Sequence, residues 1–189
     1  MSKITSYLCT LMQKYLPRVG LLIFAFLHLC FVSISFFDQP IYSWPWMGLI
    51  LIFVLITFSY FQLFTIKKQQ WASFSEFIAL VVSGVVTFYL NNNLEWGAVI
   101  ASAVVGTGGG LLPYLNKKST VLKTASPAIY CGTFVGMAST TLFDQVHYIY
   151  IASCIAALFF VFTKGLLNGY GGKLGTIAFS GVLATFYYW

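Results

Sequence analysis

Charged residues are scarce in this chain: Asp, Glu, Lys and Arg together make up only 7% of its 189 residues. Soluble proteins devote roughly a quarter of their residues to these four types. Hydrophobic residues make up 59% of the chain, and the mean hydropathy is +0.86. These values exclude an ordinary soluble domain. They predict an integral membrane protein, for which the lipid bilayer is the first partner.

Cysteine is also sparse, and its pattern excludes several chemistries. The four residues Cys9, Cys30, Cys131 and Cys154 form no C-x-x-C pair, and most lie within apolar segments. We therefore expect them to pack as small apolar side chains. Catalytic patterns such as G-x-S-x-G and H-E-x-x-H are missing from the sequence as well. The sequence predicts no enzyme, no metal site and no cofactor.

Acidic residues are fewer than basic ones, four against ten, which gives a net charge of +6. In a soluble protein such an excess would suggest nucleic-acid binding. Here the basic residues stand singly or in pairs beside apolar runs, where membrane topology explains them better. Nucleic acid is therefore not an expected partner.

Residues 1–18 have the pattern of an amphipathic helix. Apolar side chains recur at helical spacing from Ile4 to Leu16, while polar side chains occupy the opposite face. Pro17 then interrupts the pattern. We expect an interfacial helix lying on the membrane surface. A signal peptide is the alternative, although no clear A-x-A cleavage site follows the apolar run.

The rest of the chain predicts a single all-α transmembrane bundle over residues 19–189, a polytopic protein with about seven spans. The expected spans are 19–37, 46–66, 72–90, 96–115, 126–143, 146–163 and 173–189. With seven spans and the amino terminus in the cytoplasm, all ten basic residues fall on the cytoplasmic side. We therefore expect the amino terminus inside and the carboxyl terminus outside. The expected location is a cell membrane, with a bacterial cytoplasmic membrane favoured by the compact size.

Two of the expected spans repeat a small residue at every fourth position. These residues are Ala98, Ser102, Gly106 and Gly110 in one span, and Ala128, Gly132, Gly136 and Thr140 in the next. Such faces let helix backbones approach closely within lipid. We expect the two spans to pack together as an antiparallel hairpin. In the alternative, one face pairs with a second copy of the chain in a homo-oligomer.

Glycine is concentrated at the expected cytoplasmic ends of the spans. Gly108, Gly109 and Gly110 precede Pro113, so the span either ends near Gly106 or breaks where a permeation path passes. The stretch "NGYGGKLGT" places Lys173 near the start of another span. It differs from a phosphate-binding P-loop because leucine follows the lysine and no strand precedes it. An anion or lipid-headgroup site and a simple topology anchor both remain open.

Two ionisable residues fall inside expected spans. His28 lies in the middle of the first span, where it either forms a hydrogen bond between helices or belongs to a proton path. Glu76 lies about one turn inside the cytoplasmic end of the third span. Its carboxylate could reach water, pair with a cytoplasmic lysine or line an entrance. Asn91–Asn93, at the other end of that span, have the composition of a solvated turn.

The function that these features favour is a small transporter or channel-like protein for a small ion or solute. The candidate path consists of His28, Glu76, Gly108, Gly109, Gly110 and Lys173. Because polar lining is scarce, an anion or small neutral solute held by backbone groups is expected rather than a strongly hydrated cation. The alternative is a non-transporting scaffold or sensor that engages a cytoplasmic protein partner through its basic loops.

Overall fold

The computed structural model describes residues 72–165 and 172–188, together with separate positions between residues 19 and 54. The chain divides into two compact units, and the second comprises residues 71–164 and 169–189. The predicted interfacial helix at residues 1–18 lies outside the described residues, as does most of the first two predicted spans. The positions described there, such as Val19 and Leu22, are helical.

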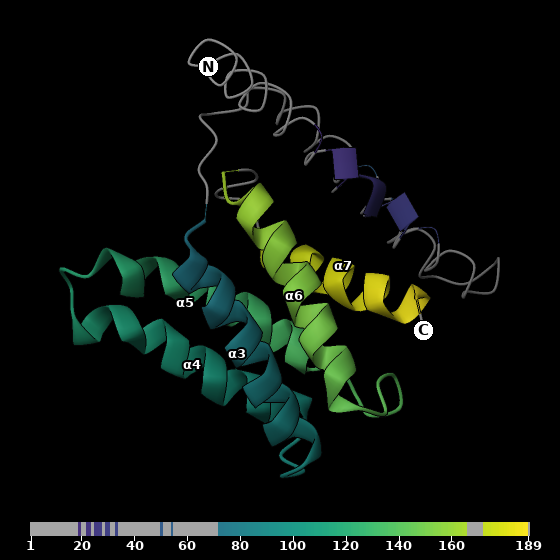
Figure 1. Cartoon of the computed structure of the whole chain (residues 1–189), viewed down its shortest axis with the longest axis horizontal. Helices are drawn as coiled ribbons and strands as arrows, with labels where there is room; N and C mark the ends of the chain where they lie inside the picture. Colours follow the sequence, from purple (N-terminus) through teal and green to yellow (C-terminus); the bar gives the residue numbers. More distant parts are fainter. Residues whose placement is uncertain are drawn as a thin grey trace, which may run out of the picture. The chain divides into compact units, whose positions relative to one another are not determined.

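The second unit is built from five helices, which Figure 1 shows in order along the chain. They are α3 (Phe74–Asn92), α4 (Ala98–Leu115), α5 (Thr120–Gly136), α6 (Val146–Thr163) and α7 (Lys173–Tyr187). The described residues contain no strand, which confirms the predicted all-helical class. Among them, α3, α4 and α6 are long and apolar enough to cross a membrane. The protein is therefore a helical membrane protein.

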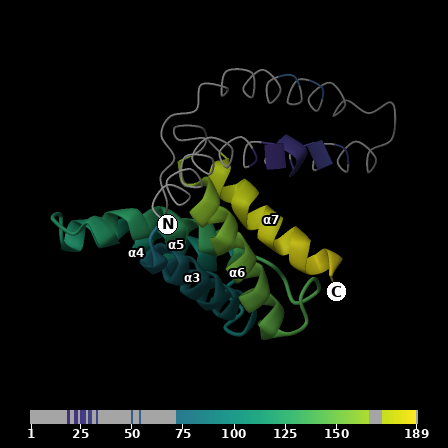
Figure 2. The ribbon, with the colours of Figure 1, turned by 45° about the horizontal axis from the view of Figure 1, so that its top comes forward.

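Helices that follow one another along the chain in this unit run in alternating directions, so that α3 and α5 are parallel. Glu76, at the start of α3, contacts Lys164, at the end of α6, so these two helices are antiparallel. Gly109 lies against Ile129, and Gly106 lies against Tyr130, so α4 and α5 are also antiparallel. In Figures 1 and 2, α6 lies between α3 and α7, and α4 and α5 form a hairpin.

Alanines are frequent in the interior beside a few large side chains such as Phe143, and many large apolar residues lie on the outside. Alanines dominate the fully buried positions, including Ala101, Ala128, Ala152 and Ala156. By contrast, bulky side chains such as Val99 are exposed, in this case by 72%. Helices in lipid gain little from burying large apolar groups, so close packing through small residues holds them together. This distribution supports a bundle whose outer surface meets hydrocarbon.

The closest helix contact joins α3 and α5. A Cβ built on Gly136 would lie 2.6 Å from the Cβ of Thr87, and one on Gly132 would collide with the Ser83 hydroxyl and the Leu80 carbonyl. The glycines of α5 therefore face α3. The sequence had suggested that they face α4, because periodicity identifies a small face but not the helix that it meets.

The ends of α5 differ from the predicted span at residues 126–143. The helix begins at Thr120 because Ser119 caps it by accepting a hydrogen bond from the Leu122 N–H. It ends at Gly136, where the side chain of Asn92 in α3 donates to the Ala138 carbonyl and accepts from the Thr140 N–H. Asn92 therefore fastens the segment that follows α5 to the end of α3, rather than standing in a solvated turn.

Substituting Gly132 tests the close approach of α3 and α5. Gly132→Ala should destabilise the protein by about 1–3 kcal/mol, because the added methyl group must displace α3 backbone and the Ser83 side chain. Gly108→Ala is the matched control, since a Cβ on Gly108 meets nothing within 4 Å. Thermal unfolding in detergent compares the two variants. Equal stability of both would contradict the glycine-mediated contact.

Candidate functional site

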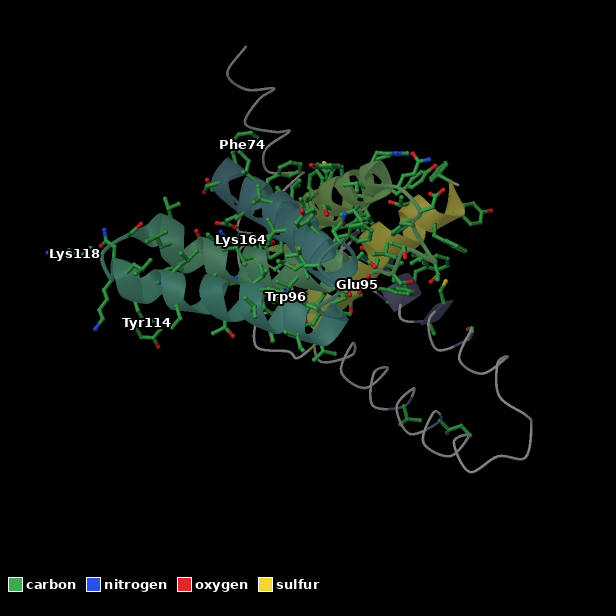
Figure 3. The ribbon with its side chains drawn as sticks, turned by 90° about the horizontal axis from the view of Figure 1, so that it is seen from below. Phe74, Glu95, Trp96, Tyr114, Lys118 and Lys164 are labelled. Atoms are coloured by element: carbon green, nitrogen blue, oxygen red, sulfur yellow. The ribbon has the colours of Figure 1, made fainter. Side chains whose placement is uncertain are left out.

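The most unusual group in the described bundle is the carboxylate of Glu76. Glu76 lies in the first turn of α3, and only 1% of its surface is exposed. The Lys164 ammonium donates to its Oε1 at 2.6 Å. Lys164 follows the last residue of α6, so the ion pair joins the start of one helix to the end of its antiparallel neighbour. Figure 3 labels Lys164 among the side chains of the bundle.

The ion pair satisfies only half of the carboxylate. The second oxygen, Oε2, is buried and has no hydrogen-bond partner. A buried charge is costly unless its remaining lone pairs are also satisfied, and removing water from an acceptor costs about 1–3 kcal/mol or more. Glu76 therefore offers an acceptor oxygen to a proton, a cation or a hydrogen-bond donor.

Lys173 extends this cluster from the first residue of α7. Its ammonium donates to the backbone carbonyl of Lys164 at 2.9 Å, which places a positive charge at the carboxyl end of α6. Gly172 precedes it with a φ of 85°, in the left-handed region that favours glycine. Lys173 thus binds a helix end, and the Glu76 carboxylate is joined to α7 through Lys164. Glu76, Lys164 and Lys173 are called the charged cluster below.

The three glycines of the predicted path take two different roles. The α4 helix continues through them to Leu115, with Pro113 inside it, so α4 is not broken in this structure. Gly109 is buried, and a Cβ there would lie 2.5 Å from the Ile129 side chain. Gly108 and Gly110 are exposed. The charged cluster contains none of them, and His28 lies outside the described residues.

The residues predicted to pack between helices differ in burial. In α4, Gly106 is buried while Ala98 and Ser102 are half-buried and Gly110 is exposed. In α5, Ala128, Gly132 and Gly136 are buried, and Thr140 lies in the turn that follows the helix. The Ser102 hydroxyl donates to the Val99 carbonyl of its own helix. The face of α4 that contacts α5 is therefore centred on Gly106 and Gly109.

Two buried hydroxyls escaped the sequence-based reasoning. Thr87 of α3 and Ser153 of α6 are fully buried, and neither hydroxyl oxygen has a hydrogen-bond partner. Ser153 Oγ would lie 2.5 Å from a Cβ on Gly84. Single hydroxyl residues are common in membrane helices, so the sequence offered no signal that would single out these two.

Comparisons with known proteins identify no family and no function for this chain. No family model, no curated protein and no solved structure matches the chain. Within residues 72–165 and 172–188, no three His, Cys, Asp or Glu side chains gather as metal ligands would. The functional argument therefore depends on the charged cluster and its surroundings.

The two partners of the ion pair should differ in the cost of their removal. Lys164→Met leaves Glu76 charged and almost fully buried, so we expect a loss of about 3–5 kcal/mol in stability. Glu76→Gln should cost less, because the side chain of Lys164 is 22% exposed and can turn toward water.

The double variant Glu76→Gln/Lys164→Met should be more stable than Lys164→Met alone. Lys118→Met is the control, because Lys118 is exposed on the α4–α5 loop, well away from Lys164 (Figure 3). Chemical or thermal unfolding in detergent measures all four variants. Strictly additive effects of the two substitutions would show that the pair is not coupled.

Proposed function

We propose that this chain is a small multi-pass membrane transporter or channel-like protein for a small ion or solute, and that Glu76 binds the transported species. The observation that carries the proposal is the buried carboxylate with one paired and one unpartnered oxygen. Ionisable groups within membrane helices are expensive, and they commonly mark ion or proton pathways. A purely structural ion pair would be expected to satisfy both carboxylate oxygens.

The charged cluster changes the expected cargo. The sequence favoured an anion or neutral solute because glycine backbone groups were the expected lining. In the structure, the unsatisfied group is an acceptor oxygen of a carboxylate, and both lysines of the cluster already donate to oxygens. A positively charged species or a hydrogen-bond donor fits such an oxygen better than an anion does.

We further propose the seven-span topology, with the amino terminus in the cytoplasm of a cell membrane. The alternating directions of α3 to α7 support it, because alternation places Lys117 and Lys164 at one side and Glu95 and Asp144 at the other. On this topology the charged cluster lies at the cytoplasmic side. Among the described helices, α5 with 17 residues and α7 with 15 residues are the shortest that this topology requires to cross the membrane.

The alternative function is a scaffold or sensor that engages a cytoplasmic protein. One observation favours it: the loop between α4 and α5 carries the exposed residues Lys117 and Lys118. Figure 3 labels Lys118 at the tip of this hairpin. The positive-inside rule accounts for the same lysines without a partner. For this reason the buried Glu76 is the stronger basis for a functional assignment.

Flux through liposomes tests the transport proposal. Purified protein in phosphatidylcholine–phosphatidylglycerol vesicles should carry at least one species from a panel of protons, alkali cations, chloride and glycerol. Glu76→Gln should lower that flux by about tenfold or more, the effect of losing one charge-assisted contact. Lys118→Met should leave it unchanged.

The scaffold alternative makes the opposite prediction. Wild-type vesicles would then show no flux above that of empty vesicles for any species on the panel. Flux that is present but insensitive to Glu76→Gln would separate transport from the charged cluster. Either result would contradict the role assigned to Glu76.

A further inference from the structure

The described lysines fall into two groups by what their side chains contact. Lys164 and Lys173, in the charged cluster, donate to oxygens of the protein. Lys117, Lys118 and Lys123 are exposed, and their side chains form no ion pair or hydrogen bond within the part of the chain that the structure describes. The helices α4 and α5 and the loop between them contain no acidic residue. These three lysines, called the basic tip below, therefore carry positive charge that their own hairpin does not neutralise.

The basic tip lies at the end of the α4–α5 hairpin that the other described helices leave uncovered. Gly109 is the last buried residue of α4, and Ala125 is the first buried residue of α5. Every residue between them is half-buried or exposed. In Figures 1 and 2, this end of the hairpin points away from α6 and α7. The lysines are therefore placed to meet groups from outside the described bundle.

The length of α4 aligns the basic tip with a membrane surface. The 18 residues of α4 extend about 27 Å along its axis, close to the roughly 30 Å of the hydrocarbon core. Exposed aromatic residues flank this length, with Trp96 just before the helix and Tyr114 in its last turn. Such rings collect where hydrocarbon meets water. Figure 3 shows Lys118 beyond Tyr114, on the side away from Trp96, so on this alignment the lysines lie in the headgroup layer.

The apolar neighbours of the lysines favour a lipid over a small anion. Leu115 and Val121, on either side of the loop, are exposed by 79% and 54%. A free phosphate gains nothing from such neighbours, whereas the acyl chain of a phospholipid covers them. An acidic cytoplasmic protein would meet the charges as well. The alignment of α4 places these apolar side chains in lipid, which makes the lipid the better match.

We infer that the basic tip binds the headgroup phosphates of anionic phospholipids at the membrane surface. Lysine ammonium groups are compact charges on flexible stems, so the tip selects negative charge rather than one headgroup structure. On the proposed topology the lipids are those of the cytoplasmic leaflet. The site lies apart from Glu76, and the inference neither requires nor predicts transport.

Native mass spectrometry of the purified full chain in a neutral detergent tests the inference. The wild type should prefer phosphatidylglycerol to phosphatidylcholine by about a hundredfold, since each of three lysines near an anionic surface contributes roughly a fivefold factor. Lys117→Gln/Lys118→Gln should reduce this preference to about fivefold. Lys67→Gln/Lys68→Gln is the control of matched charge, because it removes the other adjacent pair of lysines, and it should keep most of the preference.

Inorganic phosphate and a polyglutamate peptide serve as competing probes in the same measurement. Each should bind at least tenfold more weakly than phosphatidylglycerol, because neither has an acyl chain to cover Leu115 and Val121. Thermal unfolding without added lipid checks that the variants fold. Lys117→Gln/Lys118→Gln should unfold at the wild-type temperature, since neither side chain forms an ion pair among the described residues.

The outcomes identify what occupies the tip. An equal loss of preference in the two double variants would mean that the lipid responds to net charge alone, and it overturns the site. Phosphate binding as tight as lipid binding removes the role of the acyl chain, and tighter binding of polyglutamate makes the tip a surface for an acidic protein. None of these results concerns flux, so failure of this inference is distinct from failure of the transport proposal.

Discussion

The ion pair between Glu76 and Lys164 is the constraint on which the rest of this bundle depends. It joins the start of α3 to the end of α6, and Lys173 connects the same helix end to α7. In a low-dielectric setting a carboxylate this deeply buried needs a fixed counter-charge. The three helices are therefore tied at one end by charge, whereas elsewhere they are held by contacts between small residues.

Close packing along α3 gives the hydroxyls of this face their unusual environment. Gly132 and Gly136 let the backbone of α5 approach that of α3, and Gly84 lets Ser153 of α6 approach α3. No larger side chain would fit at these three positions without displacing a neighbour. A hydroxyl in such a place is normally satisfied by its own helix, and two here are not. Tight packing therefore fixes the spacing of α3, α5 and α6 next to the helix end that carries Glu76.

The helical class followed directly from composition and hydropathy, and pairing with a lysine was one of three alternatives that the position of Glu76 near the end of its span suggested. The identity of that lysine could not, because Lys164 is distant in sequence and depends on how α6 packs beside α3. Periodicity likewise located the glycines of α5 but not their contact with α3. Asn92 shows the same limit, since its hydrogen bonds to the segment after α5 depend on how α3 and α5 pack.

Difference infrared spectroscopy of the protein in bilayers tests the central claim about Glu76 most directly. The chain has only four acidic residues, so the carboxylate bands are few enough to assign by substitution. The account predicts that replacing N-methylglucamine by the transported cation, or raising the proton concentration, changes a carboxylate band that disappears in Glu76→Gln. A spectrum in which the Glu76 band stays the same under every condition that supports flux would contradict it.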